Sequence, residues 1–332
     1  MKLRTLLTLL VSALIAIFAW WFWHNREPSV ETTTEVTLRQ EWFPNSNYAG
    51  ALFAAHEFAL RNGIRLTIQP GSDNIDPIKL VLSGESNFGD AAADRVIAAN
   101  IKGAELVVIG VLNNTSPTVF LAREGKNIRT PFDFHGKKIG VLTGTSTEFV
   151  YRSLLRKTHI DKSTFTELDI PFDLATFITG AYDVRPAFIY DEPVSLDLKK
   201  IRYTIIRPSD YGVLFLGTVY FTTKAFADKN PGLVQQFINS VAQGWTAAIR
   251  YPDQGIRYLK EFDNGTDEDR ELQSLQKSLD YFRGYNGEVL RVDRAAWDET
   301  VNNLRELGVV DRPVPDDTIS MRFVDEYYRH TK

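Results

Sequence analysis

Residues 36–68 read VTLRQEWFPNSNYAGALFAAHEFALRNGIRLTI and contain one complete strand–helix–strand unit. Residues 36–40 alternate apolar and polar side chains, as a half-buried strand does. Residues 48–62 place their apolar side chains on one face of a helix, and Gly63 follows as a stop signal. Residues 64–68 alternate again, so the spacing predicts a second strand. This order of elements predicts an α/β protein.

Strand and helix patterns alternate as far as residue 206, in two cycles that meet near Asn127. From Lys224 onward the pattern is mostly helical. We therefore predict two α/β lobes with mainly parallel sheets, a cleft between them and a helical tail. Further strands are predicted at 87–90, 106–112, 138–142, 164–168, 184–190 and 203–206, and helices at 76–83, 94–102, 143–155, 174–179, 231–250, 252–262, 267–281, 294–307 and 319–328.

The composition is that of a folded protein without thiol chemistry. The chain has 332 residues, of which 44% are hydrophobic and 24% charged, and this length suggests about two domains. The formal net charge of -4 argues against nucleic-acid binding. The absence of cysteine excludes disulfides, thiolate metal sites and a lipid anchor on cysteine. The five histidines lack metal-ligand spacing, so we expect no metal, no cofactor and no catalytic residues.

The N-terminus has the pattern of a membrane-spanning segment. Residues 5–23 form a run of 19 residues without a charge, long enough to cross a bilayer as a helix. Lys2 and Arg4 precede the run, and tryptophans close it, as the positive-inside rule and an aromatic belt predict. We expect residues 1–26 to be an uncleaved signal anchor, with a cleaved signal peptide as the alternative, and 27–35 to be a linker. Either interpretation exports the remaining chain.

The candidate binding residues follow predicted strands, because ligands of open α/β sheets lie beyond the carboxyl ends of strands. Trp42 offers a flat face for an aromatic ring, with a core tryptophan as the alternative. Asn45 offers both donors and an acceptor, or is a turn residue after Pro44. Tyr48 adds a hydroxyl, or begins the helix. The segments that this rule selects are 40–50, 90–94, 113–117, 143–147 and 190–193.

Asp90 and Asp94 are candidate acceptors for an exocyclic amine, although Asp94 is also placed to cap a helix. The loop that contains Gly144, Thr145 and Ser146 opens a helix, so its N–H groups favour an acceptor such as a phosphate, a sulfonate or a carbonyl.

Two further candidates are Tyr190, the last residue of an apolar strand, and Glu192, which lies just beyond it, where a charged residue is either a ligand partner or part of a hinge salt bridge. Trp42 together with these acids favours a flat, amine-bearing heterocycle over a sulfonate, which would need Arg or many N–H donors. Arg185 is an arginine that would fit a sulfonate site instead, or else it is a surface residue.

Four segments carry a family resemblance: 40–50 (QEWFPNSNYAG), 82–89 (LSGESNFG), 177–186 (FITGAYDVRP) and 189–193 (IYDEP). In this order they resemble the W-x-P-N-x-x-H/Y-x-G, L-x-S-G-x-x-x-F-G, F-L-x-G-x-x-D-x-x-P and Y-x-N-E-P motifs of periplasmic binding proteins for thiamine pyrimidine precursors. The resemblance covers about residues 36–260. It implies a type II periplasmic-binding-protein fold, with lobe 1 formed by 36–120 plus 220–332 and lobe 2 by 121–219. Its hinge strands would lie near 119–121 and 219–221.

The resemblance implies a non-enzymatic, monomeric receptor that captures a thiamine-precursor pyrimidine by hinge closure and delivers it to an ABC permease. We expect it in the periplasm, anchored to the inner membrane by its N-terminal helix. The alternatives are a binding protein for a sulfonate, nitrate or another small solute, and a ligand-sensing module for a membrane partner. A fungal branch of the family makes the pyrimidine. This chain lacks that branch's cysteines and has Tyr48 in place of its histidine, so the enzyme reading is disfavoured.

Overall fold

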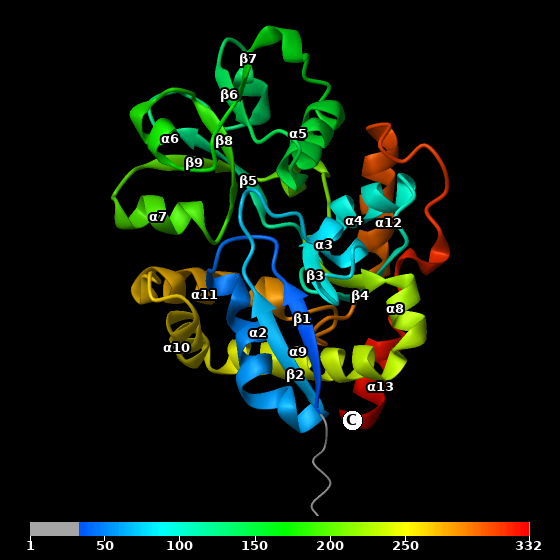
Figure 1. The fold of residues 1–332 in the computed structure, drawn as a ribbon. Coiled ribbons are helices and arrows are strands. Elements are labelled where there is room, and N and C mark those ends of the chain that lie inside the picture. The colour runs from blue at the N-terminus through cyan, green and yellow to red at the C-terminus, as the bar shows by residue number, and fades with distance from the viewer. Residues whose placement is uncertain (1–32, 332) are drawn as a thin grey trace, which may run out of the picture. The chain divides into compact units, whose positions relative to one another are not determined.

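The structure is a computed structural model that describes residues 33–331 (Figure 1). The predicted signal anchor at 1–26, and the linker up to residue 32, lie outside the described residues. Within residues 33–331 no helix is both long and apolar enough to cross a membrane. Residues from Glu35 onward form one compact unit.

Two five-stranded sheets organise this unit. The first sheet has the strand order β2-β1-β3-β10-β4, and the second has the order β7-β6-β8-β5-β9 (Figure 1). The chain passes from the first sheet to the second between β4 and β5, and returns between β9 and β10. The strands are β1 (Thr34–Arg39), β2 (Ile64–Gln69), β3 (Phe88–Ala92), β4 (Leu106–Val111), β5 (Thr118–Arg123), β6 (Lys138–Val141), β7 (Thr166–Asp169), β8 (Val184–Phe188), β9 (Tyr203–Ile206) and β10 (Thr218–Thr223).

Both sheets are mixed, which corrects the prediction of mainly parallel sheets. β1 pairs parallel with β3, and β6 pairs parallel with β7 and β8. In contrast, β10 runs antiparallel to β3 and β4, and β5 runs antiparallel to β8 and β9. The two strands that change sheets are therefore the ones with reversed direction. β5 connects to β6 without an α-helix to return the chain to the same end, so it runs opposite to its neighbours.

The predicted hinge segments 119–121 and 219–221 lie in β5 and β10. Each belongs to a different sheet, as a pair of crossing strands requires. The lobe boundaries themselves remain a prediction.

The helices follow the sequence pattern closely, with three differences. The helix predicted at 48–62 is a chain of short turns: a 3₁₀ turn, α2, a π turn at Ala54–Phe58 and a final 3₁₀ turn that ends at Gly63 with φ 84°. The last helix begins later than predicted, because Ile319 forms a parallel bridge with Val108 of β4. The third difference is α7, which begins where the predicted strand 184–190 was expected to end. The helices are α2 (Ala49–Phe53), α3 (Pro77–Leu82), α4 (Ala93–Ile101), α5 (Ser146–Lys157), α6 (Ala175–Thr179), α7 (Glu192–Leu198), α8 (Lys224–Lys229), α9 (Pro231–Arg250), α10 (Pro252–Phe262), α11 (Glu268–Phe282), α12 (Arg294–Glu306) and α13 (Arg322–Thr331).

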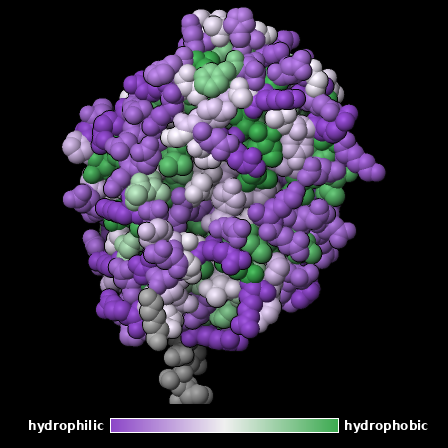
Figure 2. Space-filling view, turned by 180° about the vertical axis from the view of Figure 1, so that it is seen from behind, coloured by the Kyte–Doolittle hydropathy of each residue, from purple (hydrophilic) through white to green (hydrophobic). Residues whose placement is uncertain are grey.

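Apolar side chains are gathered inside the unit. Figure 2 shows hydrophilic side chains over most of the rear face, with hydrophobic ones in small separate patches. Inside, Phe88 of β3 stacks on Phe237 of α9 at a ring-centroid distance of 3.9 Å, and both rings are fully buried. Burial of such rings is the main favourable contribution to folding.

Two glycines allow α2 and α9 to pack in direct contact. A Cβ atom at Gly50 would lie 2.1 Å from the ring of Trp245, and one at Gly244 would lie 2.2 Å from the Gly50 carbonyl oxygen. The buried Trp245 indole donates a hydrogen bond to Tyr220 Oη at 2.9 Å. Both helices can approach this closely because neither glycine carries a side chain. Since α2 follows the loop of Trp42, the contact also fixes the base of that loop.

We expect Gly50→Ala to lower the free energy of unfolding by about 1–3 kcal/mol, because the added methyl group overlaps the Trp245 ring. Gly232→Ala is the control, since Gly232 lies in the first turn of α9 and a Cβ atom there meets nothing within 4 Å. Its free energy of unfolding should be unchanged or higher by up to about 1 kcal/mol. Urea unfolding of both variants measures the difference, and equal effects would contradict the packing argument.

Candidate functional site

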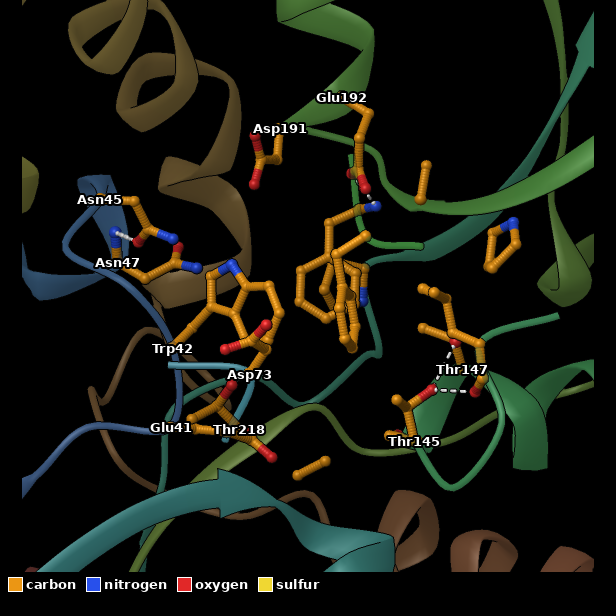
Figure 3. A pocket seen from close by; sticks show the side chains of 18 of the residues that line it. Glu41, Trp42, Asn45, Asn47, Asp73, Thr145, Thr147, Asp191, Glu192 and Thr218 are labelled. Carbon is orange, nitrogen blue, oxygen red and sulfur yellow. Dashed lines mark hydrogen bonds between the residues drawn. The ribbon is translucent and has the colours of Figure 1, made fainter. Parts of the chain in front are cut away.

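A cavity of about 640 Å³ lies where the ends of strands from both sheets meet (Figure 3). Its lining comes from the loops after β1, β2 and β7, from the start of α5, from the end of β8 with the start of α7, and from the start of β10. This volume is in the range of small-molecule sites. Of the predicted site residues, the cavity brings together Trp42, Asn45, Gly144, Thr145, Ser146 and Glu192.

Aromatic rings from both sheets form one wall of the cavity. Trp42, on the loop after β1, meets Phe172, on the loop after β7, with ring centroids 4.6 Å apart and planes tilted by 59°. Phe188, at the end of β8, lines the same space. Trp42 is half-buried, so part of the indole remains available to a ligand. In Figure 3 the Asn45 and Asn47 side chains lie beside this indole.

Tyr48 lies behind the Trp42 loop and does not line the cavity. Its side chain is buried, and its hydroxyl donates to the Trp42 carbonyl oxygen and accepts from Gly71 N at 3.1 Å. Burial raises the pKa of Tyr48, so the hydroxyl stays protonated at neutral pH. Tyr48 therefore connects the loop after β1 to the loop after β2 and holds Trp42 in place.

A cluster of carboxyl groups lies around Arg95 at the end of the first sheet. Glu41, which lines the cavity, accepts from Arg95 Nη1 at 2.5 Å, and Asp76 accepts from Arg95 Nη2 at 3.3 Å. Asp90 on β3 is buried and accepts from Glu41 N at 2.7 Å. Burial raises the pKa of Glu41 and raises that of Asp90 further.

Asp94 also belongs to this cluster but does not cap its helix. Ala92 is the N-cap residue of α4, and Asp94 lies inside the first turn with a fully buried side chain. Its Oδ2 accepts a hydrogen bond from Ser146 Oγ at the start of α5. Burial, opposed by this hydrogen bond, raises the pKa of Asp94 to about 7. Neither Asp90 nor Asp94 lines the cavity.

Some hydrogen-bonding groups of the loop at the start of α5 already have partners among the side chains of this loop and helix. Gly144, with φ 79°, donates its N–H to Glu148 Oε2 at 2.8 Å. Thr145 Oγ1 donates to the Leu142 carbonyl oxygen and lies 2.8 Å from Thr147 Oγ1. Because the Glu148 carboxylate already occupies part of this helix N-terminus, the loop is less suited to a second anion than its sequence suggests.

Glu192 is held by a buried partner. Its Oε2 accepts from Phe188 N at 2.8 Å, and its Oε1 lies 3.3 Å from Arg185 Nη2. Arg185 is fully buried, so it is not a surface residue, and it also donates to the carbonyl oxygens of Phe172 and Asp173. Burial raises the pKa of Glu192, while the Arg185 guanidinium opposes the rise. The pair thus positions the Phe172 loop and leaves Arg185 without capacity for an anionic ligand.

The wall of the cavity beside α7 involves the helical tail. Arg270 of α11 lines the cavity and donates to Asp191, and to Ser195 Oγ at 3.1 Å. Tyr190 is buried behind this wall, where its ring meets Tyr281 with centroids 5.6 Å apart. Glu41, Asn47, Thr147 and Asp191 lie in segments selected from the sequence. Asp73 and Phe172 follow the predicted strands 64–68 and 164–168, so the same rule could have identified them, whereas Thr218 and Arg270 carried no such signal.

The cavity is acidic. Its lining includes two cations, Arg95 and Arg270, and both hold carboxylate partners. The surplus of carboxyl groups favours a ligand that offers N–H donors or a positive charge. In the described part of the chain, no group of three His, Asp or Glu side chains is arranged to hold a metal ion. The lining carboxyl groups are Glu41, Asp73, Asp76, Asp173, Asp191 and Glu192.

Comparisons with known proteins show the family and the fold. The family model described as NMT1/THI5 like matches residues 45–255. A 4-amino-5-hydroxymethyl-2-methylpyrimidine phosphate synthase of Legionella pneumophila is 22% identical over 283 residues, which cover 84% of this chain and 88% of that protein. A periplasmic sulfonate-binding protein of Methylobacillus flagellatus KT shares the fold, with a TM-score of 0.69 at 14% identity over 91% of this chain and 96% of the other. The desulfurization enzyme DSZB also shares it, with a TM-score of 0.62 at 14% identity over 90% and 100% of the two chains.

We expect Glu192→Ala to lower the free energy of unfolding by about 3–5 kcal/mol, because it leaves the Arg185 guanidinium buried without its carboxylate. Glu124→Ala is the matched control, since Glu124 pairs with Arg202 at 2.7 Å with both side chains at least half exposed. This exposed pair should contribute less than about 1 kcal/mol. Chemical unfolding without ligand provides the comparison. Equal losses in the two variants would show that the buried pair has no structural role.

Proposed function

The chain belongs to the NMT1/THI5-like family, and from this premise we propose that it is the substrate-binding receptor of an ABC importer. The ligand is a small, flat, amine-bearing heterocycle of the thiamine-precursor pyrimidine class. It enters the cavity between the two sheets, which close around it and present it to a permease in the inner membrane. The receptor acts as a monomer in the periplasm, and residues 1–26 anchor it to the membrane.

The observation that carries this proposal is the pairing of an aromatic wall with an acidic lining. The Trp42 indole provides a face on which a heteroaromatic ring can stack. The surrounding carboxyl groups and the Asn45 and Asn47 amides provide acceptors for ring substituents such as an exocyclic amine. A sulfonate or nitrate would instead require cations or N–H groups without other partners. Arg95, Arg185 and Arg270 all hold carboxylates.

The comparisons support the receptor over the alternatives. A periplasmic sulfonate-binding protein has the same fold, which supports a role in solute capture. Enzymes also use it, as DSZB and the pyrimidine phosphate synthase do by name. This chain has no cysteine, and the Tyr48 hydroxyl donates its hydrogen bond to the Trp42 carbonyl oxygen behind the cavity. Binding without turnover is therefore the function that the site supports best.

We expect the full-length chain, purified in a mild detergent, to bind 4-amino-5-hydroxymethyl-2-methylpyrimidine in isothermal titration and to bind taurine and nitrate at least 100-fold more weakly. Trp42→Ala should weaken pyrimidine binding by about ten- to hundred-fold, because stacking of a base on an aromatic side chain contributes about 1–3 kcal/mol. Phe132→Ala removes an aromatic side chain that is 62% exposed outside the cavity and should leave the affinity unchanged. Tighter binding of taurine or nitrate would overturn the ligand class, and release of a chemically altered pyrimidine would overturn the receptor.

A further inference from the structure

One hydrogen bond joins the two sheets beside the cavity. Ser146 Oγ, at the start of α5 of the second sheet, donates to Asp94 Oδ2 on α4 of the first sheet. Ser146 lines the cavity, and Asp94 lies directly behind it with no exposed surface. If ligand entry requires the sheets to separate, we expect this bond to break and water to reach the carboxyl group. On that expectation the contact belongs to the closed arrangement.

The closed arrangement leaves the Asp94 carboxylate poorly supported. Within residues 33–331, its Oδ1 atom is buried and has no hydrogen-bond partner. A buried carboxylate with one neutral donor carries a large desolvation cost. A protonated carboxyl group avoids most of this cost and keeps its contact with Ser146.

Charged neighbours act on the pKa of Asp94 in both directions, because Glu41 raises it and Arg95 lowers it. Glu41 follows β1, Asp76 precedes α3 and Asp90 lies on β3, so the packed elements contribute three further carboxyl groups. Arg95 on α4 is the neighbouring cation, and it is bound by Glu41 and Asp76. The cluster therefore has one positive charge against four carboxyl groups, two of which already share it.

We propose that closure of the two sheets around the ligand takes up one proton at Asp94, because closure buries this carboxyl group behind Ser146. The inference rests on the proposed function, since it assumes that ligand binding closes the cavity. It adds regulation by pH to that function, because the receptor holds its ligand more tightly in an acidic periplasm and releases it more readily as the pH rises.

The direction follows from linkage. Burial in this structure raises the pKa of Asp94 to about 7, whereas an aspartate that opening exposes to water would have a pKa of about 4. The closed form thus binds more protons between these values, and the affinity falls by about ten-fold per pH unit from about pH 4 to pH 7. Above pH 7 neither form is protonated, and the affinity is constant.

Glu41 and Asp90 do not explain such an effect. Glu41 is bound by Arg95, and Asp90 accepts from Glu41 N, so both contacts lie within the first sheet. Those contacts remain when the sheets separate. Asp94 differs because its hydrogen-bond donor belongs to the other sheet.

The first experiment counts protons. Isothermal titration of the full-length chain with 4-amino-5-hydroxymethyl-2-methylpyrimidine at pH 6, in two buffers of different ionisation enthalpy, measures proton uptake on binding. We expect the wild type to take up about one proton more than Asp94→Asn. Ser146→Ala should take up at least as much as the wild type, because the hydrogen bond that it removes stabilises the ionised carboxylate. Protonation of the pyrimidine itself cancels in this difference.

Asp228→Asn, at an exposed carboxyl group, is the control and should match the wild type. Equal uptake by the wild type and Asp94→Asn would overturn the proposal.

The second experiment needs no ligand. Because the chain has no cysteine, Arg65→Cys and Thr166→Cys introduce two unique labelling sites on β2 and β7, which are outer strands of the two sheets. Fluorescence energy transfer between the labels should report a shift toward the closed form as the pH falls from 8 to 5. Adding Asp94→Asn should abolish the shift. A separation that does not depend on pH overturns this inference, whereas a normal shift without pyrimidine binding overturns only the proposed ligand.

Discussion

The chain must cross between its two sheets twice, and the cavity depends on this constraint. β5 and β10 are the crossing strands, and each is paired on both sides inside the sheet that it enters. The loops around them open toward a common space, so the ends of strands from both sheets supply its lining. A ligand in that space touches both halves of the molecule at once, and its contacts therefore favour the arrangement in which the halves are together.

The arginine side chains inside the site are neutralised by carboxylate partners. Arg95, Arg185 and Arg270 each hold carboxylates and so organise loops rather than attract anions. Arg185 is the clearest case, because a fully buried guanidinium serves Glu192 and two carbonyl oxygens of the Phe172 loop together. What remains for a ligand is an aromatic face with an acidic surround. Solved relatives of the same fold include a sulfonate-binding protein, so the fold alone does not determine the charge of the ligand.

Much of the fold could be predicted from periodicity, because strands and helices of this chain have clear patterns of two and 3.6 residues. The direction of β5 and β10 could not, since it depends on which sheet each strand enters. For the site, the rule that ligands lie beyond strand ends selected Trp42, Asn45 and the start of α5. It also selected Tyr48, Asp90, Asp94 and Tyr190, whose side chains turn behind the cavity, because the rule locates a backbone position and not the direction of a side chain. Arg270 comes from the tail and is brought to the cavity by long-range packing alone.

The position of Arg270 shows that the cavity is not formed by the family-matched segment alone. The part that the family model matches ends at residue 255, whereas Arg270 closes the cavity from α11. The similarity to the pyrimidine phosphate synthase of Legionella pneumophila covers 84% of this chain and so extends beyond the segment that the family model matches. α11 contacts the core through Leu275 and Phe282 and the cavity through Arg270. A substitution at Arg270 alone can therefore change the charge of one wall while the helix stays anchored by its buried side chains, so ligand preference can change at a position that contributes little to the fold.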